Sequence, residues 1–199
     1  MYFAVIGDIM SNFAGLKSIL DRLDEEGICR VIHTGNICAP RPDTGSCIAL
    51  LRARQVLCVR GHQDKTFLKE TRQRHHKGAS GKDTSPQVRL DSAALEYLNS
   101  LPRKRVLIEE NVHIVVCHGA VNSGGTILDS DTPRAVFQRQ REQEPADIII
   151  SGGSHAPFTC LVDGVLFVMP GTLLSDGGAP RYTLVNTEVL PPSAQTITL

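Results

Sequence analysis

Short apolar runs alternate with segments of helical periodicity in the first half of the chain, and this alternation constrains the fold more than any other feature. Residues 2–6 are typical of a strand, and residues 13–23 carry apolar side chains at helical spacing, with Gly27 placed to end that helix. The segments that follow are a strand at 31–33, a helix at 46–54 and a strand at 56–59. The pattern predicts a parallel or mixed sheet with crossover helices.

The second half of the chain predicts a second sheet. Its expected strands lie at 106–108, 112–117, 148–150, 158–162, 165–169 and 181–185. Asp163-Gly164 is a strong hairpin signal between two of them. A helix is expected at 94–101, and another opens with Thr132 as N-cap and Pro133 in its first turn. We therefore expect an α/β fold in which two mixed sheets pack face to face with helices outside, a four-layer αββα sandwich.

Composition sets limits on domain number, compartment and partners. With 199 residues and 41% hydrophobic composition, the chain can bury one sizeable core, so a single domain over 1–199 is expected. Acidic and basic residues are equal at 21 each, which argues against nucleic acid or an anionic membrane as the main partner. The six cysteines form no CxxC pair and are expected to be reduced. No apolar run is long enough to span a bilayer, and a cytoplasmic protein is expected.

A basic stretch at about 65–90 interrupts the alternation. It carries seven lysines and arginines against Glu70 and Asp83 and has a Gly/Ser/Lys-rich centre, which predicts a mobile surface insertion. Two interpretations stay open for this insertion. It is either a solvated loop or a basic lid over an anionic ligand.

Polar or metal-capable residues follow five of the expected strands, each beside a glycine. These pairs and segments are Gly7-Asp8, Gly35-Asn36, Gly61-His62, His118-Gly119 and 152–155. Ligands of open α/β sheets bind beyond the carboxyl ends of the strands, so these loops are expected to meet at one place. Glycine allows the sharp turns and close backbone approach that such a cluster needs.

The order of these motifs resembles the signature of the calcineurin-like metallophosphoesterases. GDIMSN, TGN, RGHQD, CHG, SGGSH and MPG stand in the order of that family's GDxHxN, GD, GNHD, GH, GHxH and NPGS motifs, over nearly the whole chain. The resemblance implies two divalent metals (manganese, iron, zinc or nickel) bridged by a carboxylate and by a hydroxide that attacks phosphorus. Asp8, His118 and His155 stand where the family has metal ligands.

Several positions depart from the family pattern. Met10 replaces a ligand histidine, and a thioether is a poor ligand for these ions. Asn36 replaces the bridging aspartate, and Gly153 replaces another ligand histidine. His62 stands in place of an asparagine ligand, whereas Gln63 stands where the family has a histidine that acts on the leaving group or the transition-state phosphate. His62 and Gln63 are therefore the candidate catalytic positions, and an amide such as Gln63 cannot donate a proton as an acid.

Three states of the metal site stay open. Asp8, His62, His118 and His155 have the number and type of donors for a single zinc-like ion, with Asn36 as a weak fifth donor. The other two states are a retained metal pair and no tightly bound metal, and one ion or none is expected rather than two. Each residue also has a structural interpretation: Asp8 as a helix cap, the histidines as hydrogen-bonded loop residues.

The altered positions favour a pseudo-enzyme, in which the fold serves as a binding or regulatory module. One member of the superfamily, a protein-sorting coat subunit that serves as a scaffold, resembles this chain at Gly35-Asn36-Ile37-Cys38. The alternative is a weak or altered metal-dependent phosphatase or phosphodiesterase with one ion. A third hypothesis is that the basic insertion binds nucleotide or nucleic acid without chemistry. The expected ligand is a phosphate-containing small molecule or a protein partner, and self-association is left open.

Overall fold

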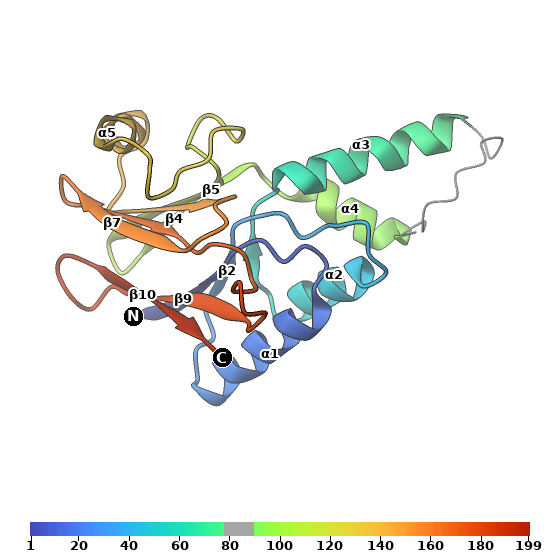
Figure 1. Ribbon diagram of the computed structural model, residues 1–199, viewed down its shortest axis with the longest axis horizontal. Coiled ribbons are helices and arrows are strands. Elements are labelled where there is room, and N and C mark those ends of the chain that lie inside the picture. The colour runs from blue at the N-terminus through green and yellow to red at the C-terminus, as the bar shows by residue number, and fades with distance from the viewer. Residues whose placement is uncertain (78–89) are drawn as a thin grey trace.

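In the computed structural model, described over residues 1–77 and 90–199, two five-stranded mixed sheets pack against each other between two layers of helices (Figure 1). The strands of the first sheet are β1 (Tyr2–Ile6), β2 (Val31–His33), β3 (Leu57–Cys58), β9 (Arg181–Asn186) and β10 (Ser193–Thr198). Their order is β10-β9-β1-β2-β3, with β1, β2 and β3 parallel to one another. The predicted αββα class is confirmed.

The second sheet has the order β4-β5-β6-β8-β7. Its strands are β4 (Lys104–Glu109), β5 (Val112–His118), β6 (Ile148–Gly152), β7 (Phe158–Val162) and β8 (Val165–Met169). β5, β6 and β8 are parallel, whereas β4 and β7 run antiparallel to their neighbours and form the two edges. Asp163 and Gly164 make the predicted hairpin turn with φ of 49° and 86°.

Over the described residues, five helices lie outside the two sheets. They are α1 (Phe13–Glu25), α2 (Thr44–Ala53), α3 (His62–Lys77), α4 (Ser92–Ser100) and α5 (Arg134–Gln143). One hydrophobic cluster joins the first sheet to α1, α2 and α4, and a second fills the space between the sheets. A third cluster packs Phe137 of α5 against Phe167 and Ile149 of the second sheet. Alternate residues of each strand thus point into different clusters, as the period of two requires.

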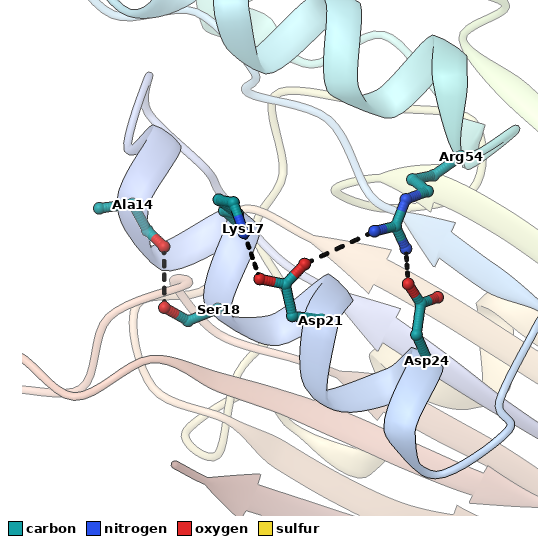
Figure 2. A network of polar contacts seen from close by, with 6 residues as sticks. All are labelled: Ala14, Lys17, Ser18, Asp21, Asp24 and Arg54. Carbon is teal, nitrogen blue, oxygen red and sulfur yellow. Dashed lines mark hydrogen bonds and ion pairs between the residues drawn. The ribbon is translucent and has the colours of Figure 1, made fainter.

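Helices α1 and α2 are also joined at the surface by charged side chains (Figure 2). Arg54, the residue after α2, forms an ion pair of 3.5 Å with Asp21 and a second with Asp24. Asp21 also pairs with Lys17 one turn earlier in α1. Most of these side chains are at least one-third exposed, so water screens the attraction.

Several predicted boundaries hold and others are wrong. The first helix ends before Gly27, which has the left-handed φ of 71°, and the fourth ends before Pro102, as predicted. The loop interpretation of residues 65–90 is wrong for the first part, because residues 65–77 belong to α3. That part contains no glycine or proline and is rich in good helix formers, although it carries few apolar residues. Residues 78–89 lie outside the described part of the chain.

Two further differences concern the ends of elements. The fifth helix begins at Arg134 with Pro133 as its cap, because the Thr132 hydroxyl is used inside the preceding turn, where it donates to Asp129 Oδ1 at 2.9 Å. Strand β9 is not the last strand: β10 follows it, a polar segment after Pro191-Pro192 that carries little strand signal. All six cysteines are free, and four of them are buried. Over the described residues, none of the helices has the length and apolar composition needed to cross a bilayer.

Candidate functional site

The loops that follow the parallel strands come together at one rim of the two sheets. The backbone joins the loop after β1 to the loop after β2, because Met10 N donates to Asn36 O at 3.0 Å and Ser11 N to Ile37 O at 2.8 Å. In the same way, Leu173 N donates to Asp8 O and Thr172 N to His155 O, each at 3.0 Å. Carboxyl ends of parallel strands share one edge, so motifs far apart in sequence become neighbours.

The side-chain amide of Asn36 connects Asp8 to the start of α3. Its Nδ2 donates a hydrogen bond of 2.7 Å to Asp8 Oδ2. Its Oδ1 accepts a bond of 2.8 Å from the backbone N–H of Gln63. Rotating the amide by 180° would place NH₂ against that N–H and oxygen against a carboxylate, so the hydrogen bonds fix its orientation. Asn36 is therefore a donor towards Asp8.

Asp8 is buried and only partly satisfied. Its Oδ1 has no hydrogen-bond partner among the described residues. Burial raises the pKa of this carboxyl, whereas the hydrogen bond from Asn36, the neighbouring His118 and the backbone N–H of Gly153 act in the opposite direction. Among the described residues, Oδ1 is therefore the oxygen of Asp8 that no side chain contacts through a hydrogen bond.

His118 is buried at the end of β5 and is held by one ring nitrogen. Its Nδ1 lies 2.9 Å from the carbonyl oxygen of Thr34, which can only accept, so Nδ1 carries a hydrogen. Nε2 is then the ring atom left for another partner. A Cβ at Gly153 would lie 3.4 Å from this Nε2, so position 153 faces His118. The same Cβ would lie 2.6 Å from Cδ1 of Ile127, which thus fills the space of a side chain at 153.

The other predicted site residues lie at the surface of the same rim. His62 and Gln63 are exposed and begin α3, and Gln63 takes part through its backbone N–H rather than its amide. His155 is exposed, and its carbonyl oxygen accepts from Thr172 and from Arg181 Nη2. Among the side chains that the structure describes, in residues 1–73 and 90–199, no three of His, Cys, Asp or Glu are gathered closely enough to hold an ion.

Sequence reasoning missed Asp64, which organises two of the loops. This fully buried carboxylate accepts hydrogen bonds of 3.0, 2.9 and 2.9 Å from the backbone N–H groups of Asn36, Cys38 and Gly61. It raises the pKa of the Cys38 thiol, together with the larger effect of burial. The sequence signal that could have identified Asp64 is its place as the last residue of RGHQD, where it is an acidic residue in the first turn of a helix.

Backbone conformation at the rim is unusual. Met10, Ser11 and Asn36 have φ of 50°, 59° and 61°, in the left-handed region that non-glycine residues seldom occupy. Strain of this kind costs on the order of 1–3 kcal/mol per residue and clusters at functional sites. The hydrogen bonds that Met10 and Ser11 donate to the loop after β2 hold them there.

These residues do not fit a pair of divalent cations. The bridging position carries an amide whose N–H hydrogens face Asp8, so a cation between the two would meet hydrogens instead of a second anion. Position 153 offers no donor, and Ile127 occupies its space. At the rim, the atoms that could receive a ligand are Asp8 Oδ1, which has no hydrogen-bond partner among the described residues, and His118 Nε2, since Nδ1 is held by Thr34.

Comparison with known proteins supports the resemblance seen in the motifs. The family model described as the calcineurin-like phosphoesterase superfamily domain matches residues 1–189. An uncharacterized protein of Methanocaldococcus jannaschii is 29% identical over 180 residues, which cover 87% of this chain and 70% of that protein.

Solved structures share the fold at low sequence identity. A metallophosphoesterase from Sphaerobacter thermophilus has a TM-score of 0.76 and 17% identity, covering 100% of this chain and 88% of its own. A novel archaeal phosphodiesterase has a TM-score of 0.63 and 15% identity, with 100% of both chains covered. Vps29 from Entamoeba histolytica, solved with Zn²⁺, has a TM-score of 0.55 and 18% identity, covering 100% and 99%.

Proposed function

Because the chain belongs to the calcineurin-like phosphoesterase superfamily, we propose that it uses this fold as a binding or regulatory module built around a degraded two-metal site. The orientation of the Asn36 amide is the observation that supports the proposal, since it places N–H donors where a metal pair needs an anion. Met10, Gln63 and Gly153 remove further groups that the superfamily uses.

The ligand of this module is a phosphate-containing small molecule or a protein partner that covers the rim. The first class follows from the superfamily and from the phosphodiesterase that shares the fold. A protein partner follows from the likeness to Vps29 and from the exposed residues around Asp8 and His118. These exposed residues are His62, Gln63, Ile127 and His155.

The test combines metal content with hydrolysis. Protein purified without chelator and soaked with manganese or zinc is expected to hold less than one equivalent of metal, measured by elemental analysis. It is expected to leave a generic phosphodiester and a phosphomonoester unchanged. Manganese-dependent hydrolysis that disappears in His118→Ala would disprove the proposal.

A revertant provides the positive control. Met10→His, Asn36→Asp, Gln63→His and Gly153→His restore the superfamily's residue types. The structure adds Ile127→Ala, because a side chain at 153 would meet Cδ1 of Ile127 at 2.6 Å. Metal uptake and turnover by this revertant, with neither in the natural sequence, would indicate an intact scaffold that has lost its chemistry.

A second candidate function is a weak hydrolase that works with one ion. It is favoured by Asp8 Oδ1, which has no hydrogen-bond partner among the described residues, and by the His118 tautomer, which leaves Nε2 free of hydrogen when the ring is neutral. His62 and His155 would have to turn inward to complete four donors. One equivalent of bound zinc, lost in both Asp8→Ala and His118→Ala, would favour this candidate over the first.

A further inference from the structure

Strand β4 ends the second sheet with an exposed apolar face. Val106 and Ile108 are 51% and 65% exposed, and no residue of β4 is buried. Across the described residues, no hydrogen bond joins the backbone of β4 to any element other than its neighbour β5. Edge strands of this kind pair readily with another strand unless charges or prolines protect them.

The long edge strand of the first sheet differs from β4. The exposed residues of β10, which ends the first sheet, are Ser193, Gln195 and Thr198, all polar. Two of the three charged residues of β4, Arg105 and Glu109, lie on its inner face. Arg105 Nε donates to Cys58 O at 2.9 Å, and Glu109 pairs with Arg30. The outer face presents the aliphatic side chains of Val106 and Ile108 beside Lys104, whose charge is paired with Glu144.

We propose that β4 is a self-association surface, at which a second copy of this chain adds its own β4 antiparallel across a two-fold axis. A two-fold axis perpendicular to the sheet keeps the outer face outer in both copies. Side chains that oppose each other across the axis must then come from the same face. Pairing with β5 assigns Val106 and Ile108 to the outer face and Leu107 to the space between the sheets.

One register of the two β4 strands sets apolar residues opposite each other and opposite charges opposite each other. With Leu107 opposite Leu107 of the second copy, Val106 opposes Ile108 on the outer face, and Arg105 opposes Glu109 on the inner face, each twice by symmetry. Centring the pair on Val106 would set Lys104 against Ile108. Centring it on Ile108 would set Leu107 against Glu109. Opposite charges and apolar pairs stabilise antiparallel neighbours, so the Leu107-centred register is favoured.

A groove of about 690 Å³ adjoins this face. It is lined by Asn111, His113, Arg141, Glu142 and Asp147 among others. His113 is the register partner of Ile108, so the groove lies on the same side of the sheet as the apolar pair. A second copy seated on β4 would extend the interface beyond the strand pair into this groove, which an interface of stable size requires.

Sedimentation velocity over a concentration series tests the proposal on the full chain. The natural sequence is expected to form dimers. Ile108→Asp is expected to raise the dimer dissociation constant about tenfold or more, because two apolar pairs are lost by symmetry. Adding Val106→Lys to Ile108→Asp is expected to restore dimers, since the Leu107-centred register sets each new lysine opposite a new aspartate. Both positions are exposed, and circular dichroism would verify that the variants fold.

Leu161→Asp is the matched control. Leu161 is a 46% exposed aliphatic residue on β7, the opposite edge of the same sheet, so this variant is expected to dimerise like the natural sequence. The proposal is overturned if the natural sequence stays monomeric at every concentration, which would leave β4 to a different protein's strand. It is also overturned if Ile108→Asp dimerises normally or if the double variant does not recover.

Discussion

Asp64 fixes the geometry of the rim without facing a ligand itself. One buried carboxylate holds three backbone N–H groups from two loops, and one of these belongs to Asn36. The Asn36 amide then determines what Asp8 meets. Hydrogen bonds thus connect Asp64 to Asn36 and, through Asn36, to Asp8. Asp64 therefore helps to determine how the two site residues lie.

Asp64→Asn is expected to lower the free energy of unfolding by about 3–5 kcal/mol, because one oxygen replaces two and an NH₂ group faces backbone N–H donors. Urea denaturation at neutral pH measures this loss. Asp8→Asn is the matched control at a second buried carboxylate. Burial raises the pKa of Asp8, so removing its charge is expected to change stability by about 1 kcal/mol or less, or to increase it. Equal losses in the two variants would contradict this account.

At the scale of elements, periodicity predicted most of the fold, because buried faces repeat every 2 or 3.6 residues. The failures have physical causes. Helix α3 buries little apolar surface, with Leu68 as its buried apolar contact, and therefore carries few apolar residues. Its composition resembles that of a solvated loop. The polar edge strand β10 gave no hydrophobic signal.

The order of the motifs allowed the convergence of the loops to be predicted, but not the orientation of their side chains. The convergence of the Asp8, Asn36 and His118 loops follows from parallel strands and was expected. The direction of the Asn36 amide, and the placement of Ile127 beside position 153, depend on contacts between loops that are far apart in sequence. No local pattern encodes such contacts.

The charged network between α1 and α2 in Figure 2 leads to a prediction of small effect. Arg54→Ala removes two ion pairs, with Asp21 and Asp24, yet is expected to lower the free energy of unfolding by less than about 1 kcal/mol. Arg54 is 32% exposed, and the apolar cluster beneath holds the helices together. Thermal unfolding in low and high salt measures the effect. A larger loss that high salt abolishes would mean that the network, rather than the core, joins the helices.

At the scale of the molecule, the strands that form the buried core also carry the loops of the rim at their ends. His33 ends β2 directly below the rim and is completely buried, with Nε2 lacking a hydrogen-bond partner among the described residues. Burial, with a smaller effect of His118, lowers the pKa of His33 to about 3. The folded protein therefore keeps this ring neutral at any pH near neutrality.

This burial links global stability to pH. The unfolded chain binds a proton at His33 below pH 6.5, whereas the folded protein does so only near pH 3. The free energy of unfolding that His33 contributes above pH 6.5 is therefore lost as the pH falls from 6.5 towards 3. Between pH 6.5 and pH 5 the loss is expected to be about 2 kcal/mol. Asp8 acts in the opposite direction, because its raised pKa lets the folded state bind a proton first.

Comparing the natural sequence with His33→Gln isolates the histidine, since Asp8 and the other carboxyls titrate in both proteins. Urea denaturation at pH 6.5 and pH 5 is expected to show the extra loss in the natural sequence alone, whatever the absolute stability of the variant. Equal losses would mean that His33 is protonated in the folded state at pH 5. That result would mean that a buried acceptor, such as the backbone carbonyl of Gly7, stabilises the protonated ring more than burial disfavours it.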